Sequence, residues 1–155
     1  AGTLLPGIRE YTVTPGEKTT TISGKGKAGL KQEENYYFFY LPVCYKGITG
    51  KSYAYYNTSR SKNLYLPASV DENYSYDIQL PENLTLCTPI QEKKIDNPIG
   101  SFKITLTSEG SSLHIELALQ IKKQLITPAE YPAFRSLITE WTDRTRKPIL
   151  FKTVQ

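Results

Sequence analysis

The sequence predicts a mostly-β fold, in which antiparallel strands form sandwich-like sheets and one amphipathic helix lies near the C-terminus. Three observations lead to this prediction. Apolar and polar residues alternate with period 2 along much of the chain, which is the pattern of half-buried strands. Tyrosine, which suits such strands, occurs 12 times in 155 residues. One stretch near the C-terminus instead repeats its apolar residues with the 3.6-residue period of a helix.

The first thirty residues predict a hairpin of edge strands followed by a flexible connection. Residues 9–14 and 18–23 are rich in threonine and poor in large apolar side chains. We therefore expect two edge strands around a turn at Pro15 and Gly16, because both residue types favour turns. Three glycines within residues 24–29 resist regular structure, which predicts a flexible connection to the rest of the chain.

The middle of the chain predicts three further strands. Residues 36–41 are apolar without alternation, so we expect a central strand with both faces covered. It should end near Pro42, because proline cannot donate to a strand ladder. Residues 52–56 form a short strand candidate. Residues 74–80 alternate cleanly and end at Pro81, which predicts a strand with one buried face.

A long hairpin is predicted between residues 101 and 125. Phe102, Ile104 and Leu106 alternate with polar residues, and residues 113–121 alternate in the same way. The turn between them, residues 108–111, contains a glycine. Two alternating runs joined by a short glycine-containing turn are typical of a β-hairpin.

A helix is predicted to begin within residues 127–130, Thr-Pro-Ala-Glu, which have the pattern of a capping box with Pro128 as the first helical residue. The apolar residues that follow share one helical face: Tyr131, Phe134, Leu137, Ile138 and Trp141. On the exposed side, Glu140 and Arg144 have the i,i+4 spacing of an ion pair. Residues 149–154 are expected to form a final strand after the helix.

Length, charge and hydropathy are those of a globular domain. We expect residues 1–155 to form a single β-sandwich-like domain, since this length suits one domain. The net charge of +4 comes with scattered lysines, whereas a nucleic-acid surface needs a concentrated basic stripe, so we expect no nucleic-acid partner. No apolar run approaches the roughly 20 residues that span a membrane, so we expect no membrane insertion. Methionine is absent even at position 1, which predicts a processed chain or a fragment of a larger protein.

The residue types that carry catalysis are sparse. His114 is the one histidine, and alternation puts it on the polar face of its strand. We therefore expect it to face solvent rather than to act as a base for Cys44 or Cys87. One histidine and two distant cysteines do not make the usual zinc or CxxC redox sites. We predict that the chain is not an enzyme, with no catalytic residue, metal ligand or cofactor. For the cysteines we predict two free thiols, with one disulfide as the alternative.

The tyrosines have two interpretations, as core residues or as a binding platform. Those in the apolar or cleanly alternating strands are expected to form core and cross-strand pairs: Tyr36, Tyr37, Tyr40, Tyr74 and Tyr76. Four others have polar surroundings, and aromatic rings with a polar tip suit binding sites. The candidate residues for binding a glycan or a peptide are therefore Tyr53, Tyr55, Tyr56 and Tyr65.

Several stretches of the chain resemble one known family. Three of them are Tyr40-Leu41-Pro42, residues 74–81 and the hairpin 101–125. The most specific stretch is residues 126–135, Ile-Thr-Pro-Ala-Glu-Tyr-Pro-Ala-Phe-Arg, together with the later Ile149-Leu150-Phe151. Through these features, residues 36–152 resemble the C-terminal domain of unknown function that follows the transglutaminase-like domain in large bacterial envelope proteins. Residues 1–35 match more weakly.

The resemblance implies a periplasmic or secreted β-sandwich domain attached to a larger protein. In that family the Cys-His-Asp chemistry belongs to the preceding domain, so the resemblance assigns no catalytic residue to this chain. It implies an upstream transglutaminase-like domain of the same parent chain as the partner. We therefore expect a non-catalytic accessory or interaction domain, with a carbohydrate- or peptide-binding module using exposed tyrosines as the alternative.

Overall fold

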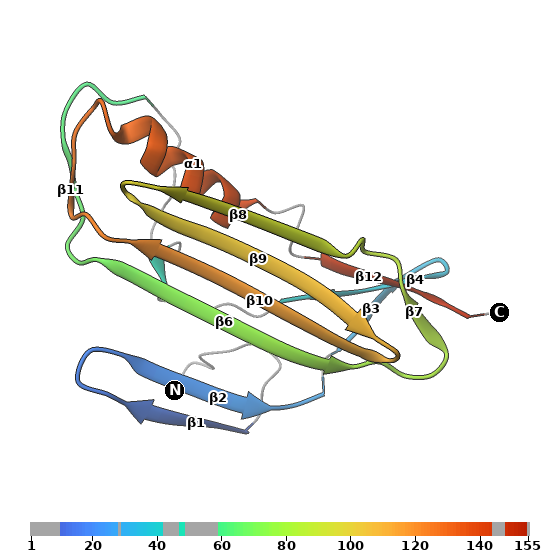
Figure 1. The fold of residues 1–155 in the computed structure, drawn as a ribbon. Helices are drawn as coiled ribbons and strands as arrows, with labels where there is room; N and C mark the ends of the chain where they lie inside the picture. Colours follow the sequence, from blue (N-terminus) through green and yellow to red (C-terminus); the bar gives the residue numbers. More distant parts are fainter. Residues whose placement is uncertain (1–9, 28, 42–46, 49–58, 144–147, 155) are drawn as a thin grey trace.

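A computed structural model describes residues 10–27, 29–41, 47–48, 59–143 and 148–154 of the protein (Figure 1). Within these ranges the chain forms twelve strands, β1 to β12, and one helix, α1, near the C-terminus. The prediction of a mostly-β fold with antiparallel sheets and one C-terminal helix is confirmed. The strand candidate at residues 52–56 lies outside the described residues. Among the described segments, no helix is long and apolar enough to cross a membrane.

The elements follow one another along the chain with these bounds. The first six strands are β1 Glu10–Pro15, β2 Thr20–Lys25, β3 Lys31–Glu33, β4 Tyr36–Tyr40, β5 Leu64–Tyr65 and β6 Val70–Gln79. The later elements are β7 Leu84–Leu86, β8 Gln91–Asn97, β9 Gly100–Glu109, β10 Ser112–Ile121, β11 Leu125–Ile126, α1 Tyr131–Thr142 and β12 Pro148–Thr153. The paired strands are antiparallel throughout.

The long strands form a four-stranded sheet in the order β6-β10-β9-β8. Strands β9 and β10 are the long hairpin that the sequence predicts, and Gly110 in their turn has a φ of 58°, which glycine adopts without strain. In the register of this sheet, Ile115 of β10 lies opposite Tyr76 of β6 and Leu106 of β9. Because alternate residues of a strand share a face, one face of the sheet is apolar and the other is polar.

Helix α1 and a second sheet cover two parts of the apolar face (Figure 1). Beneath α1, Phe134 packs in one core cluster with Phe102 and Ile104 of β9. Farther along the same strand, Leu106 packs with Phe151 of β12, which belongs to the second sheet, ordered β3-β4-β12-β7. These three β9 residues alternate on one strand face, so the helix and the second sheet lie on the same side of the long sheet.

Strand β4 is central in its sheet, as predicted, since it pairs with β3 and β12. The expectation that both of its faces would be covered is wrong. Tyr37 and Phe39 pack against the core, but Tyr36 and Tyr40 on the other face are 45% and 52% exposed. The cause is the layer order, because a sheet that packs on one neighbouring layer leaves its outer face open. For Tyr36 and Tyr40 the core interpretation is therefore also wrong.

The other tyrosines of the core interpretation are at least partly buried. Tyr37 and Tyr76 pack against the cluster beneath the second sheet, and Tyr74 packs against the cluster beneath α1. Tyr74 and Tyr76 stack with ring centroids 6.3 Å apart. Burial raises the pKa of the Tyr76 hydroxyl well above its usual range. These rings belong to the packed interior, as the alternation predicts.

Helix α1 begins at Tyr131, three residues later than the capping-box pattern predicts. The Glu130 carboxylate does reach back to Thr127, and Oε2 accepts from the Thr127 backbone N–H at 3.1 Å and from its hydroxyl at 3.0 Å. Because the hydroxyl donates to Glu130, it does not cap the helix, and residues 127–130 form a turn. Pro132, rather than Pro128, lies in the first helical turn. The predicted apolar face is confirmed, since Tyr131, Phe134, Leu137, Ile138 and Trp141 are all buried.

The predicted N-terminal hairpin is present as β1 and β2, with Val13 opposite Ile22 and Pro15 opposite Thr20. Among residues 12–25, the side chains are exposed except for half-buried Ile22. The side chains of residues 12–25 therefore contribute little to the core, as their threonine-rich composition suggests.

Candidate functional site

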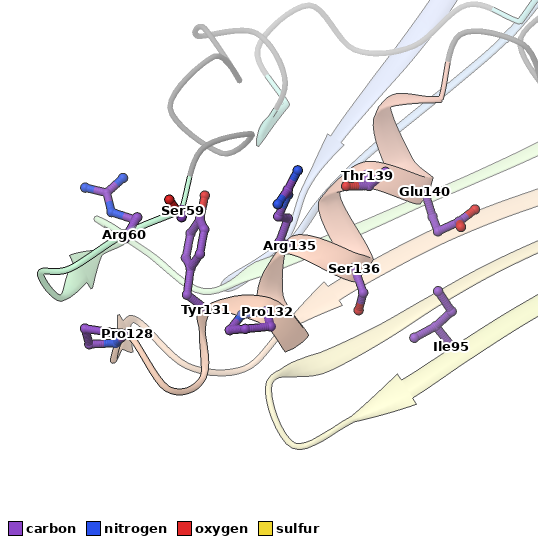
Figure 2. Close-up of a pocket in the computed structure, with 10 residues that line it drawn as sticks. All are labelled: Ser59, Arg60, Ile95, Pro128, Tyr131, Pro132, Arg135, Ser136, Thr139 and Glu140. Atoms are coloured by element: carbon purple, nitrogen blue, oxygen red, sulfur yellow. The ribbon is translucent and has the colours of Figure 1, made fainter.

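An open groove lies along the solvent side of α1, with a volume of about 480 Å³ (Figure 2). Three parts of the chain form its walls: the segment before β5, the edge strand β8, and α1 with the turn that precedes it. The lining residues are Ser59, Arg60, Ile95, Pro128, Tyr131, Pro132, Arg135, Ser136, Thr139 and Glu140. The volume falls within the range of roughly 300–1,000 Å³ that ligand sites occupy.

The helix forms one wall of the groove because its buried stripe fixes its rotation. Phe134, Leu137 and Ile138 face the sheet, so Arg135 and Thr139 lie on the exposed side of the helix. Asn97, at the end of β8, ties the first helical turn to the sheet, since its Nδ2 donates to the Ala133 carbonyl at 3.0 Å. The helix wall is therefore held by both apolar packing and a side-chain hydrogen bond.

Asn97 also shapes the turn that leads from β8 to β9. Its Oδ1 accepts from the backbone N–H groups of Ile99 at 2.9 Å and Gly100 at 3.3 Å. A Cβ added at Gly100 would lie 1.9 Å from the Gln120 carbonyl oxygen, so this position needs glycine. One asparagine thus joins three elements next to the groove.

Two arginines give the groove its basic character. The Arg60 guanidinium carbon lies 5.9 Å from the centroid of the Tyr131 ring, the geometry of a cation–π contact. Tyr131 and Arg135 are i,i+4 neighbours on the helix, and Figure 2 shows the tyrosine between the two arginines. Arg135 is exposed and makes no ion pair with a described residue.

The acidic residue at the far end of the groove is matched by a lysine. Lys93 Nζ of β8 lies 2.6 Å from Glu140 Oε1, and the Glu140 side chain is only 18% exposed. The predicted partner of Glu140, Arg144, lies outside the described residues. Glu140 is thus less exposed than expected, and it forms an ion pair that reaches across to the sheet.

Of the four tyrosines predicted as ligand-binding residues, the structure describes Tyr65. Tyr53, Tyr55 and Tyr56 lie outside the described residues. Tyr65 is 67% exposed and is paired on β5 with Leu125 of β11, which is 53% exposed. This pair lies at the end of the domain where α1 begins (Figure 1), but neither residue lines the groove.

Sequence reasoning did not identify Arg60 or Arg135 as site residues. A signal exists for Arg135, because it occupies an exposed position four residues after Tyr131 on the predicted helix. No local pattern points to Arg60. Its contact with Tyr131 joins two residues that are 71 positions apart in the sequence. The contact therefore depends on the packing of the whole domain.

His114 faces solvent on the polar side of the long sheet, as predicted. Its Nδ1 lies 2.7 Å from Asp77 Oδ1, and its Nε2 lies 3.6 Å from Glu116 Oε1. The hydrogen bond with Asp77, followed by the nearby Glu116 carboxylate, raises the pKa of His114 above its ordinary value. The hydrogen bond from Lys103, followed by the nearby His114 ring, lowers the pKa of Glu116. These contacts form a surface network of charges on the face away from α1.

Cys87 is a half-buried free thiol just after β7, and its Sγ lies 4.0 Å from the Thr85 carbonyl oxygen. It belongs to the layer of the second sheet, whereas His114 is on the opposite face of the long sheet. Cys44 lies outside the described residues. The part of the chain that the structure describes contains no cluster of three or more side chains suited to holding a metal ion.

Two comparisons with known proteins give matches. Residues 35–151 match the family described as a domain of unknown function with solved structure, DUF3858. The fold is similar to the crystal structure of "a putative protease from Parabacteroides distasonis", with a TM-score of 0.70 and 31% sequence identity. The match covers 79% of this chain and 24% of that protein, so the chain corresponds to about a quarter of its length. No curated protein matches the sequence. The family match covers most of the chain, and the chain therefore belongs to the DUF3858 family of domains of unknown function.

Proposed function

We propose that this domain is a non-catalytic interaction domain of a larger extracytoplasmic, transglutaminase-like protein, periplasmic or secreted. Its role is to pack against the upstream catalytic domain or to present partners to it. The observation that carries the proposal is the similarity to a protein of which this domain corresponds to only 24%. The remaining length of such a protein leaves room for a separate catalytic domain. The transglutaminase-like partner rests on the sequence resemblance.

The placement of the reactive side chains supports a non-catalytic role. A thiol nucleophile needs a base within hydrogen-bond reach, about 2.6–3.2 Å. Cys87 and His114 belong to different layers, and His114 is engaged by two carboxylates on the polar face. The groove along α1 offers arginines and hydroxyl groups, which suit binding better than bond cleavage.

The catalytic part of the proposal is tested with the isolated chain. We expect no turnover of amide or ester substrates above that of buffer, including acyl transfer to a primary amine. A variant carrying both Cys44→Ala and Cys87→Ala serves as the control. Turnover that this double variant loses would refute the proposal.

The partner is tested with the domain added in trans to the upstream part of its own parent chain. We expect a complex by isothermal titration calorimetry with a negative heat-capacity change, because docking buries apolar surface. A weak contact between domains has a dissociation constant of up to roughly 100 µM. Absence of binding at protein concentrations near this value would count against intramolecular docking.

A second candidate function is glycan or peptide binding through exposed tyrosines. It is favoured by the outward-facing rings of Tyr36, Tyr40 and Tyr65, which are 45%, 52% and 67% exposed. Titration with an N-acetylglucosamine tetramer, followed by tyrosine fluorescence, tests it. Saturable quenching that Tyr65→Ala or Tyr40→Ala removes would support this function, and an unchanged signal would exclude this glycan as the ligand.

A further inference from the structure

We infer that the groove along α1 binds the carboxylate side chains of an acidic peptide segment, with Arg60 and Arg135 as the two anion-binding residues. This inference rests on the proposed interaction function and names the chemistry of the partner. The evidence for it is the charge of the lining residues, the restrained position of Arg60, and the apolar surface of the groove.

The charge of the lining favours an anion. Two arginines and one glutamate line the groove, and the glutamate charge is met by Lys93 at 2.6 Å. Arg135 projects into solvent without an ion pair to a described residue, so its guanidinium can meet an incoming carboxylate. Planar guanidinium groups bind carboxylates through two parallel hydrogen bonds.

The position of Arg60 is restrained before any ligand arrives. The contact with the Tyr131 ring, at 5.9 Å, orients its side chain, and Tyr131 itself is buried at 3% exposure. Because the Tyr131 ring is held in the core, it gives the Arg60 side chain a fixed surface to contact. A restrained guanidinium loses less conformational entropy on binding than a freely moving one.

The remaining lining favours a peptide over a nucleic acid. Ile95, Pro128 and Pro132 add apolar surface to the lining, on which peptide side chains can pack. A nucleic-acid site would instead need a series of basic residues along a phosphate backbone. Ser136 is already engaged, since its hydroxyl donates to the Ala133 carbonyl at 2.8 Å, whereas Thr139 is exposed and can donate to a ligand.

Fluorescence anisotropy tests the inference with a fluorescein-labelled peptide that alternates glutamate and leucine. The matched control peptide has glutamine in place of every glutamate. We expect saturable binding of the acidic peptide alone. Arg60→Gln and Arg135→Gln should each weaken binding by about tenfold, because each removes charged hydrogen bonds. The control variant Lys94→Gln removes a positive charge from the opposite face of β8 and should change the affinity by less than about twofold.

Arg60→Lys keeps the charge but not the planar guanidinium, and we expect it to bind more weakly than the wild type and more tightly than Arg60→Gln. Circular dichroism confirms that each variant is folded.

No binding of the acidic peptide, or equal weakening by all three glutamine variants, would overturn the inference. Equal binding of an oligothymidylate would identify a nucleic-acid surface instead, and tighter binding of glutarate than of the peptide would identify a small dicarboxylate as the ligand. Both results would contradict a peptide site.

Mass spectrometry of the peptide after incubation separates this inference from the proposed function. Cleavage of the peptide would refute a non-catalytic role but leave the binding groove in place. Intact peptide with no binding would overturn the groove and leave the non-catalytic role unaffected.

Discussion

Lys93 and Glu140 join the edge strand β8 to helix α1 through an ion pair of 2.6 Å between Nζ and Oε1. The glutamate side chain is 18% exposed and the lysine 42% exposed, so the pair lies at the margin of the core. This ion pair closes one end of the groove. It also holds α1 against β8, a strand that has few apolar side chains to pack against the helix. The pair therefore combines a structural role with control of the groove charge.

Removal of the lysine should destabilise the domain. Lys93→Ala leaves a largely buried carboxylate without the ammonium group that faces it. We expect the free energy of unfolding to fall by about 1–2 kcal/mol. This is less than for a fully buried pair, because Lys93 is partly exposed. Urea unfolding measures the loss. The neighbouring Lys94→Ala is the matched control and should stay within about 0.5 kcal/mol of wild type. Equal effects of the two variants would show that the ion pair contributes nothing specific.

Truncation at the centre of the helix interface should cost much more. Phe134 is 0% exposed and packs with Phe102 beneath α1. We expect Phe134→Ala to reduce the free energy of unfolding by about 3–5 kcal/mol, through lost burial and the cavity that remains. The exposed Thr139→Ala on the same helix is the control. A loss below about 1 kcal/mol for Phe134→Ala would mean that the helix does not dock on the sheet in solution.

The His114 network should make stability depend on pH in a defined direction. The hydrogen bond with Asp77 raises the folded-state pKa of His114 above its ordinary 6.5, so folding favours the charged ring. This stabilisation is fully present below pH 6.5 and is lost as the pH rises through the higher folded-state pKa. The difference in unfolding free energy between wild type and His114→Gln should therefore shrink from pH 5.5 to pH 9.

Proton NMR reports the same equilibrium directly, because the chain has one histidine. We expect Asp77→Asn to lower the His114 pKa toward its ordinary value. An unchanged titration midpoint in this variant would show that Asp77 does not interact with the ring in solution.

Glu130 tests the turn that leads into the helix. The hydrogen bond from Lys123, followed by those from the Thr127 N–H and hydroxyl, lowers the pKa of Glu130 from 4.5 to about 2. A lowered folded-state pKa contributes stability above pH 4.5, which is lost as the pH falls through about 2. The stability advantage of wild type over Glu130→Gln should thus decrease between pH 6 and pH 2. Lys123→Gln should reduce this pH dependence, and a constant difference would contradict the turn geometry.

The cysteines give a chemical test of the free-thiol prediction. Cys87 is a free thiol in the structure, and we expect Cys44 to be free as well. Alkylation of the denatured chain without reductant should add two adducts, measured by intact mass. A chain that accepts none until reductant is added would contain a disulfide, and would strengthen the case for an extracytoplasmic location.

Local sequence patterns were enough to predict the elements whose side chains follow a backbone period. The alternation in β6, β9 and β10 and the apolar stripe from Tyr131 to Trp141 arise from strand and helix geometry alone, so each could be predicted locally. Strand β8 was not predicted, because its inward positions include polar Lys93 and Asn97. Those side chains are satisfied by Glu140 and the Ala133 carbonyl, about forty residues farther along the chain.

Local patterns do not predict which distant side chains meet or which strand faces stay open, because both depend on how the elements pack. The outward exposure of Tyr36 and Tyr40 follows from the layer order, since aromatic residues suit either a covered or an open strand face. The groove arises because packing of α1 on the sheet brings the segment at Arg60 to Tyr131 and Arg135. Local periodicity determines which way a side chain points along its own element, but the partner it meets depends on how the elements pack.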